Sequence, residues 1–142
     1  MCYELYLSTS STEDLSRYNS EWISFGNPDR LDDRYVGILR HERKWYVGSK
    51  SGCSCTFRYL AGGDLGFDEP QDWLPEEQDE LRATADLYRV VASLVQGGEK
   101  VDCLALWPGA EPARIKTMSV SLSEVPQKAF RLFEDHHFVF EP

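Results

Sequence analysis

The feature that most constrains the fold is a single long amphipathic segment over residues 76–96. Pro75 precedes it and suits the first position of a helix, and Gly97 and Gly98 follow it as a helix stop. Acidic residues fill its first turn, where they complement the helix dipole. Its apolar side chains recur at the spacing of one helix face, namely Leu81, Ala85, Tyr88, Ala92 and Val95. The sequence therefore predicts one substantial helix.

Around this helix, most of the apolar patterns are those of strands. The predicted strands are residues 3–8, 35–40, 44–48, 53–59, 101–107, 115–122 and 138–140. Residues 101–107 are almost continuously apolar, so we expect this strand to be central. Two shorter helices are predicted, one from an N-cap at Ser10 through Trp22 and one over 126–134. The order β-α-β-β-β-α-β-β-α-β predicts an α+β fold with a mostly antiparallel sheet and two or three helices packed on one face.

Length and composition set the class of protein. The chain has 142 residues, of which 42% are hydrophobic and 27% charged, so we expect a single compact α+β domain over residues 1–142. No apolar run approaches the roughly 20 residues that cross a bilayer. Residues 1–8 predict a strand rather than a signal peptide. We therefore expect a cytoplasmic protein with no membrane partner, whose cysteines are reduced.

Nearly all of the net charge of −9 lies in one stretch, which we call the acidic segment (residues 62–80). It holds eight acidic residues and no basic one, whereas the other 16 acidic residues almost balance the 15 basic ones. One interpretation is a solvated loop that leads into a helix. The other is a docking surface for a basic protein partner, with an aromatic anchor among the charges. The partner-binding residues would be Asp64, Asp68, Glu69, Asp72, Trp73, Glu76 and Glu77. Phe67 is a second aromatic in the same stretch.

The negative charge of the chain does not favour nucleic acid as a partner. Residues 30–58 do interleave basic and aromatic side chains, a composition that can stack bases. The acidic segment that follows, and the negative charge of the whole chain, would oppose binding to phosphates.

Cys53 and Cys55 form the most unusual local pair. If both belong to the predicted strand 53–59, their sulfurs point to the same face and could share one zinc or copper(I) ion. Cys2, Cys103, His41, His136 and His137 are the residues that could complete such a site. Buried structural thiols and reactive or redox thiols are the two alternatives. With buried thiols, no cofactor is needed.

The surrounding string is Gly52-Cys53-Ser54-Cys55-Thr56-Phe57. It resembles the Gly-Cys-Ser-Cys-aromatic segment of some small uncharacterised bacterial proteins. The resemblance covers about six residues and implies neither an activity nor a functional residue.

No signature of a catalytic site is present. The chain lacks G-x-G-x-x-G, P-loop and H-E-x-x-H motifs, and no nucleophile signature surrounds its cysteines. Of the two histidines beside Asp135, His137 is the better candidate for a functional residue if it faces a cleft. We therefore expect a non-enzymatic interaction or regulatory module that binds a basic partner through the acidic segment. The alternative is a small thiol or metal-site protein that uses Cys53 and Cys55.

Overall fold

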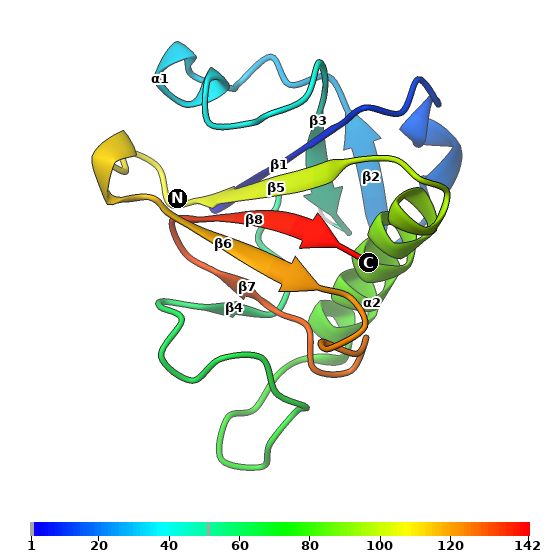
Figure 1. The fold of residues 1–142 in the computed structure, drawn as a ribbon. Helices are drawn as coiled ribbons and strands as arrows, with labels where there is room; N and C mark the ends of the chain where they lie inside the picture. The colour runs from blue at the N-terminus through cyan, green and yellow to red at the C-terminus, as the bar shows by residue number, and fades with distance from the viewer. Residues whose placement is uncertain (1, 51) are drawn as a thin grey trace.

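The computed structural model describes residues 2–50 and 52–142, and its strands form one large and one small sheet (Figure 1). The strands are β1 (Glu4–Thr9), β2 (Ile23–Gly26), β3 (Arg43–Ser49), β4 (Tyr59–Leu60), β5 (Val101–Leu106), β6 (Lys116–Ser121), β7 (Leu132–Phe133) and β8 (His136–Glu141). The large sheet has the order β2-β3-β1-β5-β8-β6, and β4 pairs with β7 in the small one. All neighbours in the large sheet are antiparallel except β6 and β8. The prediction of an α+β fold with a mostly antiparallel sheet is confirmed.

Helix α2 (Gln78–Gln96) covers one face of the large sheet, as Figure 1 shows. Its buried side chains, including Leu87 and Val91, pack with Leu5 and Leu7 of β1 and with Phe138 of β8 in the main core. The predicted helix is therefore confirmed, although it begins two residues after the predicted start. Its N-cap is Glu77, which forms a reciprocal capping box with Glu80, so Pro75 lies outside the helix.

The opposite face of the sheet has a smaller core of its own. Tyr35 and Leu39 pack there against Tyr6 of β1 and against Leu104 and Leu106 of β5. Because β1 and β5 are covered on both faces, nearly all of their side chains are buried. The expectation that β5 is central is confirmed, but the expectation that every helix packs on one face is wrong.

The cover of this second face contains α1 (Asp33–Val36), which replaces the strand predicted over residues 35–40. The Asp32 side chain accepts a hydrogen bond from the Arg34 N–H at 2.9 Å and so caps a single helical turn. Tyr35 and Leu39 lie four residues apart, which brings both onto the sheet. The apolar residues of this stretch therefore reach the sheet from a helical turn rather than as a strand.

Three other predicted elements differ from the structure. The helix predicted from Ser10 to Trp22 is only the 3-10 turn η1 (Leu15–Tyr18), capped by Asp14, and strand β2 follows it. The helix predicted over 126–134 is absent from the described residues, because the carbonyls of Lys128 and Phe130 accept hydrogen bonds from the Arg58 guanidinium. The strand predicted over 53–59 is a bent loop that becomes β4 only at Tyr59.

The remaining short helix is η2 (Pro112–Arg114), which precedes β6. The strand predicted over 115–122 is β6, on which Val120 is buried and Met118 is half-buried. Ser51, two residues before Cys53, lies outside the described residues. Within the described residues, no helix combines the length and the apolar character that crossing a membrane requires.

Candidate functional sites

Ser54 fixes the loop that carries the cysteine pair. Its buried hydroxyl accepts a hydrogen bond from the Leu5 N–H at 3.1 Å and donates one to the Val47 carbonyl at 2.6 Å. Its own carbonyl accepts from the Tyr59 hydroxyl at 2.7 Å. Ser49 adds a further anchor, because its hydroxyl donates to the Cys53 carbonyl at 2.6 Å. The loop is thus tied to β1 and β3 at the residue between the two cysteines.

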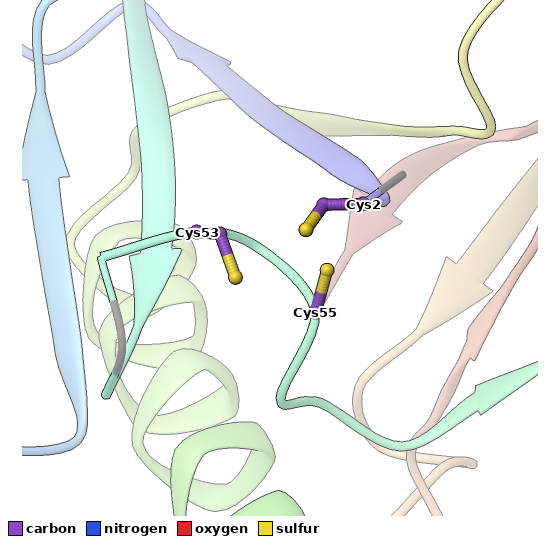
Figure 2. Close-up of side chains that lie close together, drawn as sticks. All are labelled: Cys2, Cys53 and Cys55. Carbon is purple, nitrogen blue, oxygen red and sulfur yellow. The ribbon is translucent and has the colours of Figure 1, made fainter.

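This anchoring brings three thiols together. The sulfurs of Cys2, Cys53 and Cys55 all lie within 4.8 Å of one another, and Figure 2 shows them pointing toward a common centre. Cys2 lies two residues before the start of β1, and the other two cysteines flank Ser54. The predicted proximity of Cys53 and Cys55 therefore arises from a bent loop, not from the alternation of a strand.

The other residues considered as ligands lie elsewhere. Cys103 is fully buried in β5, in the core beneath α2, and does not belong to the three-sulfur cluster. His136 and His137 belong to β8, and His41 lies just before β3. Only Cys2, among the additional ligands that the sequence suggested, joins the pair.

The surroundings of Cys55 favour its protonated form when no cation is present. Burial, together with hydrogen bonds with the Cys2 and Cys53 thiols, raises the pKa of this thiol to about 12, although a hydrogen bond with the Tyr3 main chain acts in the opposite direction. Beside it, the Tyr3 ring stacks on Tyr59 with ring centroids 3.9 Å apart. The cluster therefore combines three soft ligands with a rigid aromatic wall on one side. A cation would have to displace the thiol protons.

The acidic segment is attached to the body of the protein by Arg58. The guanidinium of this buried residue donates to both carboxylate oxygens of Glu76 at 2.8 Å and to the Asp68 carbonyl at 2.9 Å. Together with Lys128 and Phe130, these groups accept all five of its N–H donors. Arg131 also donates to the Asp68 carbonyl, at 2.6 Å.

One predicted partner-binding residue is taken up by this attachment, and the second aromatic residue of the segment packs inside the protein. The Glu76 side chain is only 11% exposed, because it is committed to Arg58. Phe67 is half-buried and packs on Phe133, with ring centroids 5.0 Å apart, and on Phe130. The other predicted partner-binding residues are exposed, namely Asp64, Asp68, Glu69, Asp72, Trp73 and Glu77. Trp73 is 66% exposed, the largest value among the exposed large hydrophobic residues of the described chain.

Sequence reasoning missed a buried charge in the middle of the sheet. Asp102 on β5 is fully buried, and its carboxylate lies 2.6 Å from Nε2 of His137 on β8. It also accepts hydrogen bonds from the Ser8 hydroxyl and from the Arg40 N–H. Thr117 contacts Nδ1 of His137 at 3.2 Å. An aspartate inside the continuous apolar run 101–107 was the signal that could have revealed this network.

The Asp102 network does not have the geometry that activates a serine nucleophile. The Ser8 hydroxyl donates to the Asp102 carboxylate rather than to the His137 imidazole, so the histidine is not placed to take the serine proton. His137 is almost fully buried and does not face a cleft, contrary to the condition under which it would have been a functional candidate. The pair therefore belongs to the structure of the sheet.

The chain matches no protein-family model, and comparisons with curated proteins and with solved structures give no match. Function has to be inferred from the thiol cluster and the acidic segment themselves.

Proposed function

We propose that this protein binds a soft metal ion, zinc or copper(I), through the thiolates of Cys2, Cys53 and Cys55. The single observation that supports this most directly is the mutual approach of the three sulfurs to within 4.8 Å. Around one metal ion with metal–sulfur bonds of about 2.3 Å, sulfurs stand roughly 4 Å apart. Small rotations of the three side chains would bring them to that spacing.

The type of ligand narrows the choice of metal. Thiolates favour zinc and copper(I) over magnesium and calcium, which take oxygen ligands. Zinc normally has four ligands, so three cysteines would leave one position for water or an outside group. Cys2 is exposed, and the site would therefore be open to loading and release from solvent.

The loop geometry supports a preorganised site. Ser54 is buried and bonded to both neighbouring strands, so the two cysteines that flank it are held at a fixed distance. Tyr3 follows Cys2 in the chain and stacks on Tyr59, which restrains the third ligand. Contacts of this kind orient metal ligands and raise affinity.

The test is metal loading of tag-free protein under reducing conditions. We expect one equivalent of Co²⁺ to give an intense sulfur-to-metal charge-transfer band, and zinc or copper(I) to displace it. The variant C53S/C55S should lose the band. The matched control is C103A, which removes a thiol that lies outside the cluster. A band that survives in C53S/C55S, or no bound metal in the wild-type protein, would contradict the proposal.

We also propose, as a second function, that the acidic segment binds a basic protein partner without catalysis. The observation that favours it is the exposed Trp73 ring among exposed carboxylates such as Glu69 and Asp72. Aromatic anchors of this kind contribute much of the affinity at interfaces, and the charges would speed association. The internal pairing of Glu76 keeps the segment in place.

A defined lysine-rich peptide with one leucine provides the probe for this second function. Reversing Asp72 and Glu77 to lysine should weaken binding at low salt by about tenfold or more. The control reverses Glu99 and Glu124, which changes the net charge equally but lies outside the segment. Equal weakening by both double variants would show that only the net charge matters and would refute a docking surface.

A further inference from the structure

A cavity of about 350 Å³ lies apart from the thiol cluster, between the start of the acidic segment, β6 and β8. Its lining includes Gly63, Phe67, Met118, Phe133 and His136. This volume falls within the range of sites that hold small organic ligands. Neither proposed function makes use of it.

His136 places one polar atom in this cavity. The residue is only 9% exposed, and its Nδ1 lies 2.8 Å from the Glu134 carbonyl. Because a carbonyl can only accept, Nδ1 carries a hydrogen, and in the uncharged form of the ring Nε2 is then an acceptor. Among the described residues, no protein group is hydrogen-bonded to Nε2.

Gly63 keeps that acceptor accessible. A methyl group built on this glycine would lie 3.4 Å from Nε2 of His136 and 3.5 Å from Cδ2 of Phe133. Because both residues line the cavity, the glycine leaves unfilled a position there that lies within contact distance of the nitrogen. An acceptor that is buried on its other sides and open toward a cavity is suited to a ligand that donates one hydrogen bond.

The walls indicate the shape of the ligand. Phe133 stands edge-on to the His136 ring with centroids 5.4 Å apart, and Phe67 packs on Phe133 at 5.0 Å. Flat rings pack well against such walls. Lys116 and Asp64 also line the cavity, and their charges are opposite, so the site favours neither an anion nor a cation.

We infer that this cavity binds a small, neutral, planar aromatic molecule whose hydroxyl or N–H group donates to Nε2 of His136. The inference does not depend on the metal site or on the acidic docking surface, because the groups that would bind the ligand, His136, Phe133 and Phe67, belong to neither.

Phenol and toluene provide the test, since they share the ring and differ in the donor. Titrations followed by NMR, through the methyl group of Met118 and the ring signals of His136, give both affinities. We expect phenol to bind about three- to tenfold more tightly than toluene, as one hydrogen bond would contribute. Equal affinities, or no binding of either compound, would overturn the inference.

Two variants localise the effect. G63A covers the nitrogen with a methyl group at ordinary contact distance and should abolish the preference for phenol, whereas G62A, whose methyl meets nothing within 4 Å, should keep it. H136F retains a flat ring but no acceptor, so it should bind toluene and phenol alike. Thermal melts of all three establish that they are folded. A preference for phenol that persists in G63A and H136F would place the ligand elsewhere and refute the site.

Discussion

Replacement of Ser54 by alanine should lower both the stability of the fold and the affinity for metal. The hydroxyl is fully buried, accepts from the Leu5 N–H and donates to the Val47 carbonyl. S54A leaves these two main-chain groups without that partner. Each buried group left unsatisfied costs about 1–3 kcal/mol, so for the two groups together we expect a loss of about 2–6 kcal/mol in the free energy of unfolding. For a chain of this size that corresponds to a Tm lower by roughly 6–20 °C.

Urea and thermal unfolding followed by circular dichroism measure the first effect, and Co²⁺ titration of the folded protein measures the second. Loss of a residue that orients metal ligands typically lowers affinity about 10–100-fold. The control is T56V in the same loop, because the hydrogen bond recorded for Thr56 uses its main-chain N–H. If S54A unfolds within about 0.5 kcal/mol of T56V, or binds Co²⁺ as the wild type does, the anchoring role of Ser54 is refuted.

Two further predictions concern buried charges. Burial raises the pKa of Asp102, but its bonds to His137, Ser8 and the Arg40 N–H outweigh that effect and hold the pKa below 3.8. The stability that this carboxylate contributes is therefore present above about pH 4 and lost as the pH falls below it. Urea unfolding of D102N at several pH values should show a smaller loss of stability at acid pH than the wild type, and an equal loss would contradict this. R58M should lower the free energy of unfolding by about 3–5 kcal/mol, as measured by thermal denaturation, because it leaves the Glu76 carboxylate buried without its partner. R17M, whose ion pair is exposed, should cost less than about 1 kcal/mol, and similar losses for both would refute the argument.

The sequence could predict the long elements, because packing in the core determines which of their positions are apolar. The apolar run of β5 is long and buried along its whole length, so pattern and structure agree there. The helix of α2 was also predicted, but its buried face is centred beside the predicted stripe. Leu87, Val91 and Leu94 are buried, whereas Leu81, Ala85, Tyr88 and Ala92 are only half-buried. The short elements depend instead on hydrogen bonds made by single side chains. The Asp32 cap produces a helical turn at Tyr35, and the Arg58 guanidinium takes the carbonyls that a helix over 126–134 would need. Propensity carries no information about a donor that arrives from 70 residues away.

The candidate sites likewise depend on contacts that the local sequence pattern does not show. The pairing of Cys53 and Cys55 was predicted from alternation, yet the sulfurs are close because Ser54 anchors the loop between them. Cys2 could be proposed as a ligand, but its place beside the pair depends on the pairing of β1 with β3. His136 was considered as a metal ligand and as one of two adjacent histidines, not as part of a cavity. Its open nitrogen depends on Gly63, more than 70 positions earlier in the chain, which no local pattern connects to it.

The strand order has a consequence for how the chain folds during synthesis. β8 lies between β5 and β6 in the sheet, although it is the last strand along the chain. Until residues 136–141 leave the ribosome, β6 has no strand to pair with, and one edge of β5 stays open. Between the synthesis of β5 and that of β8, the nascent chain would expose an unpaired, apolar edge, a state in which strands from other molecules can add. Completion of the large sheet therefore waits for β8, and a chaperone that shields β5 would be most useful just before β8 emerges.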